Sequence, residues 1–300
     1  MTATRLLLLL CCLASLTACG GGRRGSSEPE LLKRRYRNGE SISYRLKGVN
    51  KSLARTYTYQ ARADGVVKKD AAGVYSEEFR WSQLRVDNVS VPLSSASANF
   101  TQTLSLDPDY VMGPAALEGV QRELLAPILD LMTFYADQWL AIKRGAFRRQ
   151  GDHVYVKHGT PNSWADGTRL LLAEDAIDFQ LHLTSVDELT KNAVVRVRHV
   201  PPSKSKVRLN ADWMREPVVG RVQNNWVQVT KNADGKYSAA VGMETFEVEL
   251  RIGLRDGRIK SAKMDNPVTV RERLCSDDAL TDCEEPVEYR TRRQLELTAL

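Results

Sequence analysis

Apolar and polar residues alternate along most of this chain. The pattern is clearest at 246–254, where every second residue from Phe246 to Leu254 is apolar and Glu247, Glu249 and Arg251 lie between. Residues 177–183 repeat it. A period of two with one apolar face is typical of strands in a half-buried antiparallel sheet. The same signal predicts further strands at 41–47, 54–62, 74–86, 99–106, 153–157, 193–200, 226–230, 236–241, 268–274 and 287–297.

Turn residues lie between or beside these runs. Asp-Gly pairs occur at 64–65, 166–167, 234–235 and 256–257. Such pairs supply the positive φ that a tight type I′ hairpin needs. The clearest predicted hairpin is 246–264, turned at Asp256-Gly257. Gly151-Asp152 is expected to turn another hairpin, from 146–150 into 153–157.

One region has a helical period instead. From 116 to 143 apolar residues recur at intervals of three and four, which predicts an amphipathic helix. Pro127 is expected to kink it or to split it into two helices. Gly145 is a plausible stop. The apolar side of such an insertion needs a packing partner, and a sheet face is the obvious one.

Together these elements predict a mainly β, α+β fold. We expect a curved antiparallel sheet or incomplete β-barrel with the 116–143 insertion against its concave side, because large sheets curl and open edges invite aggregation. Residues 39–300 are expected to form one domain. The segment 200–225 lacks alternation and contains three prolines, so it is expected to be a long connection between two halves of one sheet or two small domains.

The N-terminus indicates export. Arg5 precedes an apolar run that is shorter than the roughly 20 residues a membrane span needs, so residues 1–18 are interpreted as a signal peptide. Leu16-Thr17-Ala18-Cys19 resembles the lipobox of bacterial lipoproteins. The resemblance implies cleavage before Cys19 and lipids on that cysteine. In the family an Asp after the cysteine retains the protein at the inner membrane, so Gly20 implies the outer membrane.

A plain secretory signal with an incidental cysteine is the alternative interpretation of the same residues. Residues 19–38, rich in Gly, Ser, Arg and Glu, are expected to form a flexible basic tether, with folded structure beginning near Asn38-Gly39. The chain has a net charge of +6. Basic residues beside a lipid anchor attract anionic headgroups, although a solvated linker explains them equally well. The basic cluster lacks interleaved aromatics, so no nucleic-acid partner is expected.

The cysteines support an oxidising compartment. Of five in the chain, three lie within the first 19 residues, leaving Cys275 and Cys283. An even remainder predicts one disulfide, and the spacing is not that of a redox motif. Acidic residues cluster around this pair. Because they lack the calcium-loop pattern, a solvated acidic loop is favoured over a calcium site.

Few residues suggest chemistry. No spacing typical of a metal site or a phosphate loop occurs, so no metal and no cofactor are predicted. The densest polar loop is 158–168, and its candidate binding residues are His158, Asn162, Trp164 and Asp166. The plainer interpretation of this loop is a structured turn with Trp164 packed against the sheet.

Three functions follow from these patterns. The first is a non-catalytic, lipid-anchored envelope lipoprotein whose curved sheet binds an apolar ligand or an envelope protein partner. The second is a structural or assembly subunit of an envelope protein complex. The third is a hydrolase using the 158–168 loop, although the nucleophile motif G-x-S-x-G is absent. The predicted layout resembles that of the lipoprotein carriers and receptors of the outer-membrane sorting pathway. Aromatic residues on alternating strands are the candidate lining of an apolar cavity or, more simply, core residues: Tyr57, Tyr59, Phe79, Trp81, Phe100 and Trp226.

Overall fold

A single antiparallel sheet dominates the structure, a computed structural model that describes residues 31–112, 116–157, 178–200 and 211–300. The sheet has 13 strands in the order β4-β3-β2-β1-β13-β12-β11-β8-β7-β6, with β5 beside β3 and with β10 and then β9 beside β12. Within the described residues its two ends do not pair, so the predicted mainly β, unclosed sheet is confirmed. The strands are β1 Ser41–Lys51, β2 Thr56–Lys69, β3 Tyr75–Val86, β4 Val89–Ser90, β5 Gln102–Leu104, β6 His153–Lys157, β7 Asp178–Asp187, β8 Asn192–Val200, β9 Trp226–Lys231, β10 Tyr237–Glu244, β11 Phe246–Gly253, β12 Ile259–Cys275 and β13 Val287–Ala299.

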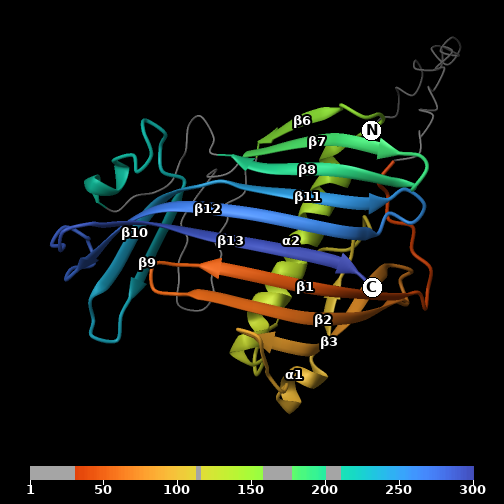
Figure 1. Ribbon diagram of the computed structural model, residues 1–300, viewed down its shortest axis with the longest axis horizontal. Coiled ribbons are helices and arrows are strands. Elements are labelled where there is room, and N and C mark those ends of the chain that lie inside the picture. Colours follow the sequence, from red (N-terminus) through yellow and green to blue (C-terminus); the bar gives the residue numbers. More distant parts are fainter. Residues whose placement is uncertain (1–30, 113–115, 158–177, 201–210) are drawn as a thin grey trace, which may run out of the picture.

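The long helix α2, Arg122–Gly145, crosses one face of the sheet (Figure 1). It begins six residues later than predicted and continues through Pro127 as one helix, so the expected split is wrong. Proline removes only one helical hydrogen bond here, the one to the Glu123 carbonyl. The adjacent Leu124 and Ile128 are fully buried, and their packing holds the helix together. A short helix α1, Ser95–Asn99, precedes β5.

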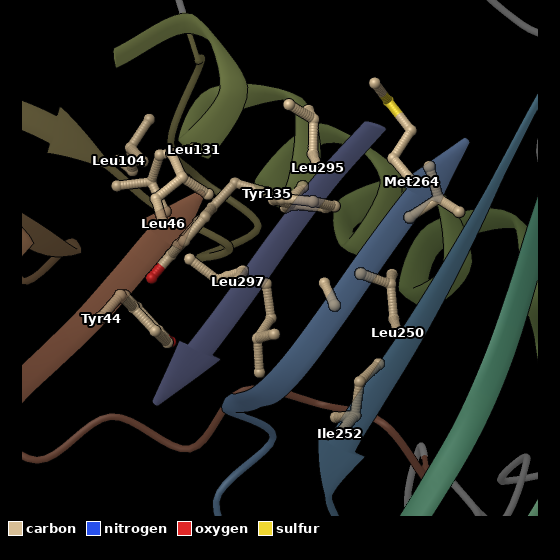
Figure 2. Close-up of a cluster of buried hydrophobic side chains, with 14 of the residues drawn as sticks. Tyr44, Leu46, Leu104, Leu131, Tyr135, Leu250, Ile252, Met264, Leu295 and Leu297 are labelled. Carbon is tan, nitrogen blue, oxygen red and sulfur yellow. The ribbon is translucent and has the colours of Figure 1, made fainter. Parts of the chain in front are cut away.

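The main core lies between α2 and the sheet. Inward-facing residues of the strands pack against one side of the helix, as Figure 2 shows for Leu131 and Tyr135 beside Leu46 and Leu295. Burial alternates along the strands beneath α2, for example β1, β3 and β11, so the polar residues between lie on the opposite side of the sheet. We call this side, which faces away from α2, the open face.

The structure differs from the sequence prediction at three places: the Asp64-Gly65 pair, the Gly151-Asp152 pair and the start of the folded body. Asp64-Gly65 is not a turn but lies inside β2. The ring of Phe79 packs over Gly65, where a Cβ would lie 2.6 Å from it, so this glycine is explained by aromatic packing. Asp234-Gly235 and Asp256-Gly257 do lie in the predicted hairpins, with both glycines at positive φ.

The hairpin predicted at Gly151-Asp152 is also wrong, because residues 146–150 form no strand. The Asp152 carboxylate accepts hydrogen bonds from the backbone N–H groups of Arg148 and Arg149, at 2.8 and 3.0 Å. These bonds hold the segment in a turn. Strand β6 pairs with β7 instead.

Folded structure begins earlier than residue 38. Leu32 and Arg34 are buried, and the Arg35 N–H donates to the Asp256 carbonyl at 2.9 Å. The part of the predicted tether from residue 31 to 38 therefore belongs to the folded body. Residues 1–30 lie outside the described residues.

A second, smaller core lies to one side of α2, around the far part of β12 (Figure 1). Strand β12 pairs with β11 up to Asp265 and with β10 from Val268 onward. Strand β9 in turn pairs with β10, and the short helix η1, Asp212–Arg215, contributes to the same core. We call this region the extension. It continues the main sheet through β12 and β13, and its buried residues are Ala211, Met214, Val227, Ala239, Val241, Cys275 and Leu280. Of the predicted connection 200–225, residues 201–210 lie outside the described residues.

Candidate functional site

The polar side chains beneath α2 resemble a catalytic cluster at first sight. Tyr135 of the helix donates to the Glu77 carboxylate, and Arg34 Nε donates to the same carboxylate at 2.8 Å. Both charged side chains are only 1% exposed. Burial raises the pKa of Glu77, and the Arg34 charge opposes that rise. Burial and the neighbouring Glu77 also raise the pKa of Tyr135.

This cluster is explained by folding. Arg34 also donates to Glu40 at 3.1 Å and to the backbone carbonyl of Asp256 at 3.1 Å. One guanidinium thus joins the N-terminal segment, β3 and the β11–β12 turn directly, and reaches α2 through Glu77. Buried charges are retained only when they are paired and hydrogen-bonded in this way.

Two other residues of α2 contact the sheet in a similar manner. Asp137 Oδ1 lies 3.0 Å from Nε2 of His199 on β8, and the two side chains are 5% and 11% exposed. The His199 ring packs against Phe179 and Phe246. Asp130 accepts a hydrogen bond from the Tyr59 hydroxyl and pairs with Arg293. These contacts fix the helix in one position across the strands.

The open face is the candidate functional surface, and its two halves differ in charge. Across β8, β11, β12 and β13 the register places opposite charges side by side. Arg196 and Arg198 pair with Glu247 at 3.0 and 3.2 Å, and Arg292 pairs with Asp265 at 2.6 Å. This half is electrically balanced.

Two shallow depressions lie on this half of the sheet. One has a volume of about 610 Å³ and is lined by charged residues of β8, β11, β12 and β13. The other, of about 460 Å³, is lined by β6, β7 and β8. There His153 lies directly opposite His182, beside Tyr155 and Arg196. Charged or polar side chains contribute to both linings. Among the described residues no group of three or more His, Cys, Asp or Glu side chains suited to a metal occurs.

The other half of the open face, on β1, β2 and β3, is strongly basic. Besides Lys68, it carries six cations that we call the basic strip: Arg45, Lys47, Lys51, Arg62, Arg80 and Arg85. The carboxylates on this face of the three strands are Asp64, which pairs with Arg62, and Glu78, which pairs with Lys68. Within the described residues Arg45, Lys47, Lys51 and Arg80 form no ion pair.

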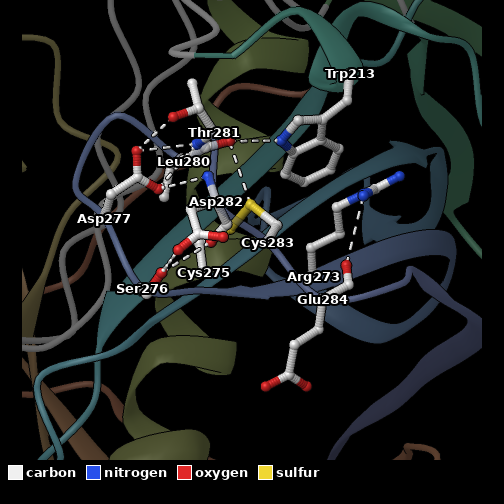
Figure 3. Close-up of a disulfide and its surroundings, with 10 residues drawn as sticks. All are labelled: Trp213, Arg273, Cys275, Ser276, Asp277, Leu280, Thr281, Asp282, Cys283 and Glu284. Carbon is white, nitrogen blue, oxygen red and sulfur yellow. Dashed lines mark hydrogen bonds between the residues drawn. A yellow bond between two sulfur atoms is a disulfide. The ribbon is translucent and has the colours of Figure 1, made fainter.

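The predicted site residues have mixed outcomes. Cys275 and Cys283 form the predicted disulfide (Figure 3). The loop residues His158, Asn162, Trp164 and Asp166, and the predicted lipid-bearing Cys19, lie outside the described residues.

The acidic loop around the disulfide is held by its own hydrogen bonds. Asp277 accepts from the Thr281 hydroxyl at 2.6 Å and from the Asp282 N–H at 2.9 Å, which lowers the pKa of Asp277. The Trp213 indole donates to the Leu280 carbonyl at 3.0 Å and joins η1 to the loop. The loop therefore has a structural explanation.

The six aromatic residues proposed to line a cavity lie largely in cores. Tyr59, Phe79 and Trp81 are buried in the main core beneath α2. Tyr57 and Phe100 pack at its margin, and Trp226 packs against a separate small cluster around Val268. The plainer interpretation, that these are core residues, is the one the described structure supports.

Sequence reasoning did not identify the basic strip or the Arg34 cluster. Alternation assigns each cation to the polar side of its own strand. The charge balance of a surface depends also on which strands are neighbours, and the alternation within one strand does not contain that information.

Comparisons with known proteins add little. No protein-family model matches the chain, and no curated protein matches it. Solved structures that it resembles include MucB in complex with MucA(peri), at 12% identity over 86% of this chain and 89% of that chain, with a TM-score of 0.15. The Pseudomonas aeruginosa MucA/MucB complex has the same identity and coverage and a TM-score of 0.14. At these values the likeness supports no argument about fold or function. None of the helices among the described residues is sufficiently long and apolar to cross a bilayer.

Proposed function

We propose that this protein is a non-catalytic bacterial envelope lipoprotein that is anchored through Cys19 and docks on another envelope component through the open face of its sheet. The observation that carries the proposal is the difference between the two faces. One face is covered by α2 and packed into a core. The other leaves charged side chains of β1–β3, β8 and β11–β13 exposed to a partner.

The disulfide supports an extracytoplasmic location. Disulfides persist in oxidising compartments and are rare in the cytosol. Cys275 is fully buried within the extension, so this bridge is part of the fold. Such a location agrees with the signal peptide and lipobox, which are the basis for Cys19 as the lipid-bearing residue and for the outer membrane as its destination.

The apolar-ligand version of this function has less support. Five of the aromatic residues expected to line a cavity are instead packed in the core between α2 and the sheet, and Trp226 packs in a separate small cluster. Both depressions described above lie on the open face, away from the core beneath α2, and charged side chains contribute to each lining. Mass spectrometry of a lipid extract from the purified protein tests this version directly, since a stoichiometric apolar ligand would restore it.

A non-catalytic role fits the polar groups that the structure describes. The buried acids and histidine under α2 contact one another and the backbone in ways that position the helix. A hydrolase would have to rely on the 158–168 loop, which is outside the described residues.

Metabolic labelling and cross-linking test the proposal in cells. We expect radiolabelled palmitate to enter the wild-type protein and not the Cys19→Ala variant. A photo-reactive residue at Lys47, on the open face, is expected to cross-link to envelope material, whereas one at Lys143, at the exposed end of α2, is expected to do so less. Absence of lipid from the wild type would overturn the anchor, and equal cross-linking from both positions would overturn the docking face.

A further inference from the structure

The basic strip contains like charges that face each other directly. In the β1–β2 register Arg45 lies opposite Arg62, and in the β1–β13 register Lys51 lies opposite Arg292. Both pairs lie on the open face. Like charges directly opposite on adjacent strands destabilise a sheet.

The rest of the same sheet shows the alternative arrangement. Arg196 lies opposite Glu249, and Arg198 lies opposite Glu247, with an ion pair in each case. Folding alone would favour acids opposite Arg62 and Arg292 as well. Lys47 of β1 does lie opposite an acid, Glu296 of β13. Arg45 and Lys51 lie opposite arginines instead, and they are better explained by something that binds them than by the fold.

We propose that the basic strip docks on the anionic headgroups of the membrane to which Cys19 is anchored. This inference rests on the proposed function, because it names the envelope component that the open face meets. The proposed contact is electrostatic, between the lysine and arginine side chains of the strip and a layer of headgroup phosphates. Each cation close to an anionic surface strengthens binding about fivefold.

The character of the strip favours a headgroup layer over a protein partner. Protein interfaces are centred on aromatic and other large apolar side chains. On the open face of β1–β3 the side chains between the cations are small or polar, apart from Val49 and Val66. A surface with many cations and no apolar anchor suits a layer of phosphates.

The length of the proposed tether brings the strip within reach of the bilayer. Eleven residues, and so twelve Cα–Cα steps, separate Cys19 from Leu31, where the described body begins. Fully extended they span about 40 Å at most. An anchored body is thus confined near the headgroups, which raises the effective concentration of the strip there.

Vesicle binding tests this inference separately from the anchor. The full chain carrying Cys19→Ser, which cannot take the lipid, is mixed with phosphatidylcholine vesicles with and without a one-third share of phosphatidylglycerol. The test variant adds Arg45→Glu and Lys51→Glu, each of which places an acid opposite an arginine. The control adds Arg215→Glu and Arg221→Glu, exposed positions of the extension, for the same change in net charge.

We expect the parent and the control to prefer the anionic vesicles, with a preference that weakens as salt is added. The test variant is expected to lose at least about tenfold in affinity for the anionic vesicles. Its thermal unfolding should stay at or above that of the parent, so misfolding would not explain the loss.

Three results would overturn the inference. They are equal binding by test and control variants, no preference of the parent for anionic vesicles, and a specific acidic protein cross-linked to the strip in cells. Palmitate labelling gives an independent answer about Cys19. A labelled protein without vesicle preference would refute only the docking surface, and an unlabelled one with vesicle preference would refute only the anchor.

Discussion

Arg45 of β1 lies directly opposite Arg62 of β2 on the open face, and Arg62 in turn pairs with Asp64 of its own strand. The two guanidinium groups repel each other, and among the described residues Asp64 is the one carboxylate that forms an ion pair with either of them. A sheet selected for stability alone would carry an acid at position 45. This pair therefore marks a place where stability and function are expected to conflict.

Replacing Arg45 by Glu is expected to stabilise the protein by about 0.2–1 kcal/mol, because a repulsive cross-strand pair becomes an attractive one. Urea unfolding at low salt measures the change. Arg45→Gln, which only removes the repulsion, should give a smaller gain. A destabilised Arg45→Glu variant would show that the like-charge pair has no energetic meaning.

Removing Arg34 is expected to be strongly destabilising. The Arg34→Met substitution removes the cation from the buried Glu77 carboxylate, at a cost of about 3–5 kcal/mol. Chemical denaturation measures the loss. The double variant Arg34→Met with Glu77→Leu should recover much of it, because neither charge then remains buried.

Arg37→Met is the matched control for this experiment. Arg37 lies in the same segment but is exposed, so its replacement should change stability by less than about 0.5 kcal/mol. Equal losses for the Arg34 and Arg37 variants would contradict the role of Arg34 as the residue that fixes the N-terminal segment.

The Arg45–Arg62 and Arg34–Glu77 pairs show which features the sequence predicts and which it does not. Alternation in 246–254 and its neighbours predicts strands and their buried faces, since a period of two is a local property of the chain. The Arg34–Glu77 pair joins positions 43 residues apart, and no local pattern connects them. Arg34 lies in a basic segment that resembles a linker, so the start of the fold was placed too late.

For the same reason the sequence predicts which residues lie on the open face but not which charges meet there. Alternation assigns Arg45 and Arg62 to the polar side of their strands, but whether a cation meets a carboxylate or another cation depends on register. The Asp64-Gly65 pair shows the opposite error. A local turn signal predicted a hairpin, and the packing of Phe79 over Gly65 explains that glycine within a continuous strand.

Acid is expected to loosen the disulfide loop through Asp277. Hydrogen bonds from Thr281 and from the Asp282 backbone lower the pKa of Asp277 below its ordinary value of 3.8. The folded state thus holds the proton less tightly than the unfolded state. Asp277 stabilises the loop above its unfolded pKa, and this contribution disappears as the pH falls through the lowered folded value.

An NMR titration of the Asp277 carboxyl measures the lowered pKa directly. The Asp277→Asn variant should show a weaker loss of loop protection in acid than the wild type, because it has no proton to gain. Identical acid profiles for loop amides of the two proteins would contradict this assignment.

Gly65 is expected to be intolerant of any side chain. A Cβ there would lie 2.6 Å from two carbons of the Phe79 ring, which is fully buried and cannot move aside. Gly65→Ala should therefore cost about 1–3 kcal/mol, as overpacking in a core does. In the Phe79→Leu background the same substitution should cost less, because the smaller side chain leaves room for the added methyl. A double-mutant cycle by urea denaturation measures this coupling, and simple additivity of the two changes would mean that Gly65 is required for some reason other than the ring.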